Sequence, residues 1–226
     1  MILFLDTAFN ETKIVLKKDE KLYKSIISEK KNISKEIIKS LNSILVNSQS
    51  STKDISIIYF NNGPGNFTSL RVALSCVKAL AFYLNVPIIK LNSFQILALS
   101  KKDFKDSYPI IVAIDAKMNE IYWQFYNDKN ELFQENQNYR LSSINDFFLD
   151  LKKYNFKKHY IVKNDINFLP NYKKILPNVT EAIIKNKKID FNHLIFEVEK
   201  HQDNLKCKIE DVNLLYIRDN IAEKKK

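Results

Sequence analysis

The stretch NNGPGNFTSLR, residues 61–71, holds both glycines of a chain of 226 residues. It follows the apolar, strand-like run ISIIYF (55–60) and opens an apolar helical pattern. Proline fixes one φ angle, and each glycine either adopts a positive φ or lets another backbone approach closely. Asn66 or Thr68 can cap the helix that follows. We interpret Gly63, Pro64 and Gly65 as a tight corner between a strand and a helix.

The same corner has a second interpretation, as an anion site. Backbone N–H groups and a helix N-terminus together attract phosphate. The P-loop pattern GxxxxGK[ST] is absent, however, and a Rossmann fingerprint needs a third glycine. We therefore favour a structural corner. For Arg71, an arginine in a lysine-rich chain, we expect a fixed internal contact rather than a substrate clamp, because its planar fork suits a fixed geometry.

Alternating and helical patterns extend outward from this corner. The predicted strands are 2–8, 12–17, 21–28, 54–62, 86–92 and 159–165. The predicted helices are 32–47, 68–84, 93–102, 144–155 and 193–202. We predict a loop and short helix over 175–186, and an extended segment over 210–220.

The chain also repeats itself. IIVAIDAKMNEIYWQFYNDKNELFQE (110–135) echoes MILFLDTAFNETKIVLKKDEKLYKS (1–25), and the turn KKDEKLY aligns with NDKNELF. Asp6, Asn10 and Glu11 align with Asp115, Asn119 and Glu120. An echo at half the chain length predicts an α/β protein of two lobes built on one plan, residues 1–106 and 107–226.

Composition narrows the classes of function. The formal net charge is +10, but the lysines are spread along the chain, which is typical of a solvated surface rather than a nucleic-acid stripe. Weak attraction to RNA remains an open alternative. We expect no signal peptide and no membrane span, and a cytoplasmic protein with reduced thiols, because Cys76 and Cys207 show no metal or CxxC spacing.

The loop and helix NNGPGNFTSLRVALSCVKALAFYLNVPIIKLNSFQILA (61–98) strongly resemble the TsaB family signature, GPGxFTxLR followed by a short strand and an S-x-x-x-L-A helix. ILFLDTAFNETKIVL resembles the opening strand pair of that family, VAIDAKMNEIYWQFY its second hairpin, and LLYIR (214–218) its closing segment. The resemblance covers nearly the whole chain. It implies an actin-like ATPase fold (ASKHA, ribonuclease H-like) with two lobes, each with the duplicated β-hairpin plus helices, the second reduced.

The resemblance also implies a function. TsaB proteins are non-catalytic scaffold subunits in the bacterial synthesis of threonylcarbamoyladenosine (t6A) on tRNA. They pair with TsaD, which transfers the threonylcarbamoyl group, and the ATPase TsaE joins that pair. For this chain it implies a heterodimer with TsaD through helices 32–47 and 68–84, contact with tRNA only through the complex, and a homodimer through the same face as an open alternative.

The residues that this reading assigns fall into two groups. The structural loop comprises Gly63, Pro64, Gly65, Phe67, Thr68 and Arg71. The predicted partner interface comprises Ile33, Ile37, Leu41, Leu74, Lys78 and Ala81.

The sequence departs from the family pattern at a few positions. Asn66 stands where Ser is frequent, Ser69 where Gly is frequent, and Ala8 where Ser is usual. The His-Ser that usually precedes the first helix is replaced by KKNISKE (30–36).

We expect no catalytic residue, metal or cofactor. Actin-like ATPases grip nucleotide with glycine-rich loops in both lobes, and no glycine follows Gly65. For Asp6, Thr7 and Asp115 we expect turn geometry, with an Asx-type bond closing each hairpin. His159, His193 and His201 lack the i, i+4 spacing of a metal pair, and Cys76 is interpreted as a small core residue.

Three alternatives stay open beside the scaffold subunit. The two-lobed echo and Asp6-Thr7 also fit an independent actin-like ATPase or kinase. A metalloprotease is disfavoured by the histidine spacing. A stand-alone basic RNA binder is motivated by charge alone.

Overall fold

The structure is a computed structural model that describes residues 1–28, 32–102, 108–134, 138–154, 158–164, 181–185 and 189–218. It divides into two compact units, Met1–Ser93 with Ile195–Leu215, and Phe94–Leu194 with Tyr216–Lys226. The sequence predicted one boundary, at 106/107. In the structure the chain passes between the units three times, because its C-terminal part returns to the first unit and then rejoins the second.

The first unit is built on a mixed sheet. Its strands are β1 (Ile2–Asp6), β2 (Glu11–Lys18), β3 (Lys21–Ser28), β4 (Ile57–Asn61), β5 (Ile88–Leu91) and β11 (Lys206–Cys207). They lie in the order β11-β5-β4-β1-β2-β3. The β1-β2-β3 meander is antiparallel, whereas β4 pairs parallel with both β1 and β5. The five strands predicted in this half are confirmed, although those predicted to start at 54 and 86 begin at Ile57 and Ile88.

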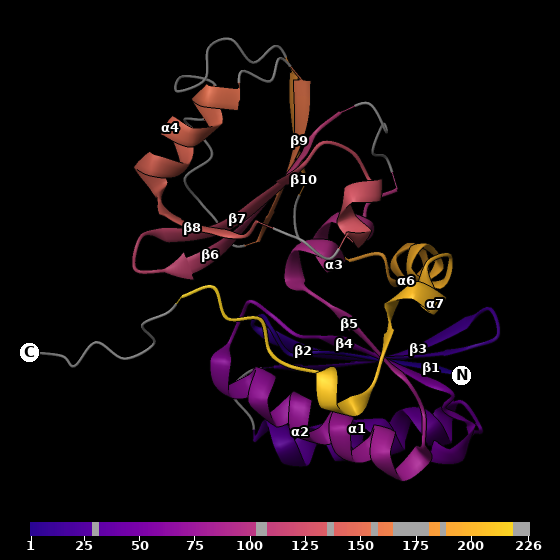
Figure 1. Cartoon of the computed structure of the whole chain (residues 1–226). Helices are drawn as coiled ribbons and strands as arrows, with labels where there is room; N and C mark the ends of the chain where they lie inside the picture. Colours follow the sequence, from indigo (N-terminus) through magenta and orange to yellow (C-terminus); the bar gives the residue numbers. More distant parts are fainter. Residues whose placement is uncertain are drawn as a thin grey trace, which may run out of the picture. The chain divides into compact units, whose positions relative to one another are not determined.

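Two helices cover one face of this sheet. Helix α1 (Ile33–Asn47) and helix α2 (Phe67–Leu84) lie side by side beneath the strands (Figure 1). Alternate strand residues such as Leu3, Ile14 and Ile58 meet the buried stripes of both helices in one core cluster. The alternation of the strands and the helical period therefore bury the same side. The 3-10 helices η1 (Thr52–Asp54) and η4 (Ile209–Asp211), helix α7 (Gln202–Leu205) and most of α6 (Phe191–Glu199) complete the unit.

The second unit repeats the arrangement. Its strands are β6 (Ile110–Lys117), β7 (Glu120–Tyr126), β8 (Arg140–Ser143), β9 (Lys158–Asn164) and β10 (Glu181–Lys185), in the order β10-β9-β6-β7-β8. Helix α4 (Ile144–Tyr154) packs on it through Phe147, Phe148 and Leu151, against the buried Trp123. Most of helix α3 (Ser93–Leu99) and the 3-10 helix η2 (Asn130–Phe133) belong to this unit.

Counted within each unit, both sheets have the same strand order, third-second-first-fourth-fifth. The first three strands form an antiparallel meander, and the fourth and fifth are added in parallel. The predicted duplication is confirmed, and so is the actin-like α/β fold that the resemblance implies.

Two details of the prediction are wrong. The second turn of the echo diverges, because NELF forms η2, and the third strand of the second unit is Arg140–Ser143 instead. Residues 181–185, predicted as part of a short helix, form strand β10, which pairs parallel with β9. A short apolar run fits either state, and a neighbouring strand with free hydrogen-bonding groups decides between them. The rest of that prediction, 175–180 and 186, lies outside the described residues.

Helix α2 is long and apolar enough to cross a membrane by length and composition, contrary to the expectation that no segment would be. One side of it packs in the core. It lies on β1 and β4 and beside α1, and it begins at a capped loop that is hydrogen-bonded into the sheet. Leu70, Ala73, Val77 and Ala81 are buried on that side, whereas Phe82 and Tyr83 are exposed.

Candidate partner face and its glycine corner

The two glycines are needed for two different reasons. Gly63 has a φ of +104°, a conformation that a side chain disfavours. Gly65 faces the backbone of Ala8, and a Cβ placed on it would lie 2.2 Å from the Ala8 carbonyl oxygen. The prediction that the corner needs positive φ and close approach is confirmed, with one glycine serving each purpose.

Three N–H groups of the corner are bonded within the protein. Gly63 donates to the Asn61 side-chain oxygen at 2.9 Å, and Asn66 donates to the Ala8 carbonyl oxygen at 2.7 Å. The Ser69 N–H donates to the Asn66 side chain at 3.0 Å, so Asn66, not Thr68, is the cap. A phosphate at this helix start would compete with all three bonds, which favours a structural corner over an anion cradle.

A buried polar network holds the corner against the sheet. The Asn61 amide donates to Asp6 Oδ1 at 2.8 Å, and the Ala8 N–H donates to the same oxygen at 3.0 Å. The Ser93 hydroxyl donates to the Pro64 carbonyl oxygen at 2.7 Å. The Ser93 backbone N–H donates to the Gly63 carbonyl oxygen, also at 2.7 Å. Each backbone group so bonded avoids the cost of burial without a partner. The corner is therefore held by residues of β1 and β4 and by the first residue of α3.

Sequence reasoning missed Asn61 and Ser93. The signal available was a polar residue at the end of each of two neighbouring strands, in IIYFN and IIKLNS. The Asx bond predicted for Asp6 is present, and Asp115 makes the matching bond to the Lys117 N–H at 2.8 Å. The duplication thus extends to side-chain hydrogen bonds.

Arg71 has the internal contact that was expected. Its guanidinium carbon lies 3.7 Å from the centroid of the Phe67 ring, within one turn of α2. Thr68 is exposed on the same turn.

The predicted interface residues divide into two sets. Ile37, Leu41 and Ala81 are 3%, 8% and 0% exposed. They pack in the core of their own unit, so the assignment of these three to a surface is corrected. Ile33, Leu74 and Lys78 are half-buried, and Ile33 and Leu74 border the same core. The helical period correctly marked an apolar stripe, but that stripe faces the sheet.

The outward side of the helix layer carries large apolar side chains that the sequence analysis did not single out. Ile38 and Val46 on α1 are 60% and 75% exposed, and Phe82 and Tyr83 on α2 are 81% and 69% exposed. We call these four residues the outer apolar face. Half-buried Leu74, Lys78 and Leu80 lie on the same helix α2.

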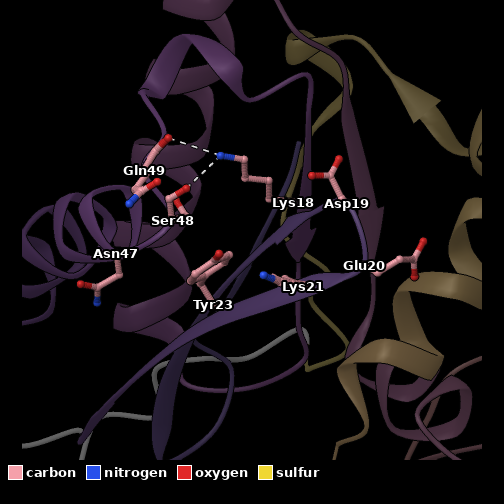
Figure 2. A pocket seen from close by; sticks show the side chains of 8 residues that line it. All are labelled: Lys18, Asp19, Glu20, Lys21, Tyr23, Asn47, Ser48 and Gln49. Carbon is pink, nitrogen blue, oxygen red and sulfur yellow. Dashed lines mark hydrogen bonds between the residues drawn. The ribbon is translucent and has the colours of Figure 1, made fainter.

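A polar pocket of about 510 Å³ lies where the β2–β3 turn meets the C-terminal end of α1 (Figure 2). Lys18 turns its ammonium toward that end and donates to the carbonyl oxygens of Ser48 and Gln49, at 2.9 and 3.3 Å. A cation at a helix C-terminus is stabilising. The pocket's most central cation thus serves as a cap.

The titratable groups do not assemble into a metal site within the described ranges, where no three His, Cys, Asp or Glu side chains gather. His159 is buried on β9, and burial lowers its pKa to about 4. Half-burial raises the pKa of the Cys76 thiol, as expected for a residue that borders the core. Arg218 pairs with Glu120 and donates to the Ala116 carbonyl oxygen, which fixes the closing segment to the β6–β7 hairpin.

Known proteins are similar to this chain in sequence and in structure. A family model described as "TsaD: tRNA N6-adenosine threonylcarbamoyltransferase" matches residues 22–226. The "tRNA threonylcarbamoyladenosine biosynthesis protein TsaB" of Buchnera aphidicola subsp. Acyrthosiphon pisum is 29% identical over 85% of this chain and 93% of its own length. The protein of that name from Escherichia coli K12 is 26% identical over 58% of each.

Among solved structures, YeaZ from Pseudomonas aeruginosa superimposes with a TM-score of 0.66 at 16% identity, over 96% of this chain and 99% of that one. A second Pseudomonas aeruginosa structure, described as similar to peptidase YEAZ, gives a TM-score of 0.72 at 17% identity, with the same coverage. At these identities the two structures support the fold. The family model covers nearly the whole chain, and the curated relatives carry the TsaB name. The chain therefore belongs to the threonylcarbamoyltransferase family that this model describes and, within it, to the TsaB (YeaZ) group.

Proposed function

We propose that this chain is a non-catalytic subunit of the cytoplasmic system that builds threonylcarbamoyladenosine on bacterial tRNA. It binds the transferase subunit TsaD through the outward side of α1 and α2, and TsaE joins that pair. The family model and the names of the curated relatives support the place in t6A biosynthesis. Contact with tRNA runs through the complex.

The observation that carries the proposal is the outer apolar face. A helix layer that only covers its own sheet buries its apolar stripe and shows polar groups outward. Here both helices bury an apolar stripe against the sheet. Ile38, Val46, Phe82 and Tyr83 lie outside that stripe and are exposed. Large exposed apolar side chains gathered on neighbouring elements are typical of protein–protein interfaces, where aromatic residues supply much of the affinity.

The corner supports the non-catalytic part of the proposal. The backbone N–H groups of Gly63, Asn66 and Ser69 donate hydrogen bonds within the protein. The phosphate-gripping geometry of an ATPase needs such groups free. The corner sets where α2 starts, and α2 carries half of the outer apolar face.

The test is co-expression with the cognate TsaD, followed by size-exclusion chromatography and a t6A assay on tRNA. Phe82→Glu combined with Val46→Glu places two charges in the face, and we expect at least a hundredfold loss of affinity and loss of t6A formation. Ile26→Glu is the matched control. Ile26 is 61% exposed, and it points to the opposite face of the sheet because its neighbour Ile27 packs into the core shared with the helices.

Circular dichroism and denaturant unfolding establish that each variant is folded before binding is compared. A folded double variant that still co-elutes with TsaD and supports t6A formation contradicts the proposed face. Equal loss in the Ile26→Glu control would show that the effect is not specific to the helix layer.

A further inference from the structure

Asp6 is the most completely enclosed carboxyl group of the first unit, and its two oxygens have unequal surroundings. The residue is 0% exposed. Oδ1 accepts from both the Ala8 N–H and the Asn61 amide. Oδ2 is buried and has no hydrogen-bond partner, and neither has the buried hydroxyl of Thr7 next to it.

The charges around Asp6 do not balance an ionised carboxylate. Its cross-strand partner on β2 is Lys13, which attracts it electrostatically, but the Lys13 ammonium makes its ion pair with Glu11, at 3.8 Å. The neighbouring strand β4 presents the neutral Asn61, and the corner presents peptide groups and the Ser93 hydroxyl. An ionised group without a hydrogen bond on one oxygen and without an ion pair is costly in such a place.

We propose that Asp6 is held as a neutral carboxylic acid in the folded chain, and that its protonation stabilises the corner from which α2 starts. A proton on Oδ2 removes the uncompensated charge and leaves Oδ1 free to accept its two hydrogen bonds. When the proton leaves, the link from Asp6 through Asn61 to the Gly63 N–H is anchored to a buried charge, and the folded state loses stability. This inference is independent of the proposed function.

The direction of the pH dependence follows. Burial raises the pKa of Asp6, against the opposing effects of Lys13 and the two hydrogen bonds. When the folded-state pKa lies above the unfolded one, the added stability is complete below the unfolded value and is lost as pH rises through the folded value. Within that window the folding equilibrium constant falls about tenfold for each pH unit.

The duplicated hairpin supplies a matched control. Asp115 occupies the same position and makes the same Asx bond, but it is half-exposed and pairs with the Lys117 ammonium at 2.8 Å. Both of its carboxyl oxygens therefore have a partner, unlike those of Asp6. Asp6→Asn replaces the neutral acid by a neutral amide of the same shape, whereas Asp115→Asn removes a paired charge.

The experiment measures denaturant unfolding of the wild type, Asp6→Asn and Asp115→Asn between pH 5 and pH 8. The buried His159 contributes a pH dependence of opposite sign in all three proteins, so the free energies of unfolding are compared as differences from Asp6→Asn. We expect the wild type and Asp115→Asn to lose stability relative to Asp6→Asn as pH rises, and Asp6→Asn to be at least as stable as the wild type at pH 8. A pH dependence that persists unchanged in Asp6→Asn overturns the proposal.

A second measurement does not depend on the variants folding. In the wild type labelled with carbon-13 at aspartate, the Cγ resonance of Asp6, assigned through its backbone correlations, reports protonation directly. We expect Asp6 to show the chemical shift of a carboxylic acid at pH 5. A carboxylate shift for Asp6 at pH 5 sinks the proposal.

Discussion

At the scale of single residues, the corner shows why a chain so poor in glycine keeps two of them together. Gly63 adopts a positive φ angle that other residues disfavour, and Gly65 avoids the collision that a Cβ would make with Ala8. The two requirements differ physically, since the first is intrinsic to the residue and the second depends on Ala8, in the distant turn between β1 and β2. Asn61 and Ser93 then satisfy the polar groups that the sharp turn leaves over.

This difference predicts an order of stability. Gly65→Ala would place a methyl group 2.2 Å from a backbone oxygen that the sheet holds in place, so we expect a loss of about 3 kcal/mol in the free energy of unfolding. Gly63→Ala has the cost of a positive φ, and its Cβ meets the end of the Leu70 side chain at 3.1 Å and the Leu215 carbonyl oxygen at an ordinary contact distance of 3.4 Å, so a loss of about 1–2 kcal/mol is expected. Guanidinium unfolding of both variants measures the order, and a smaller loss for Gly65→Ala contradicts it.

At the scale of elements, α2 illustrates what periodicity shows and what it leaves open. Its sequence is apolar nearly all round, which is typical of burial on more than one face, but the structure buries only one stripe of it. Leu70, Ala73, Val77 and Ala81 meet the sheet, whereas Phe82 and Tyr83 face outward. The predicted interface residues Ile37, Leu41 and Ala81 fell on the inward stripe, because an apolar stripe looks the same in sequence whether a sheet or a partner covers it.

We expect substitution by Glu to reduce the stability of the protein strongly on the buried face of α2 and very little on its exposed face. Ala81→Glu buries an unpaired charge in the core, and we expect a loss of more than about 3 kcal/mol in the free energy of unfolding. Its exposed neighbour Phe82→Glu should change stability by no more than about 0.5 kcal/mol. Thermal unfolding of the two variants in parallel tests this. Equal stability would mean that Ala81 is not enclosed as the structure has it.

At the scale of the whole molecule, two units share one strand order and one hairpin design, and their second halves differ. Each unit interrupts the other along the chain. Both glycines of the chain lie in one corner of the first unit, and the second unit has none. The actin-like fold does not by itself imply nucleotide binding.

The hydrogen bonds and glycines of the corner predict how the isolated chain behaves when ATP is titrated into it in a calorimeter. We expect the isolated chain, titrated with ATP and magnesium, to show no stoichiometric binding and no turnover, because the N–H groups of the corner are already engaged. The complex with TsaD and TsaE is the matched positive sample. Tight binding to the solitary chain would favour the independent ATPase.

The sequence by itself determined the strands of the first half, the corner, the duplication and, through the signature at 61–98, the family. These features are local, since alternation, helical period, glycine and Asx chemistry act over a few residues. The tertiary structure alone decided which side of α1 and α2 is buried, that 181–185 form a strand, and that Asp6, Asn61 and Ser93 meet. Those outcomes depend on segments distant along the chain, such as β9 for residues 181–185, and Ser93 and Asp6, which lie 32 and 55 residues from Asn61. No pattern within one segment records what another segment will place beside it.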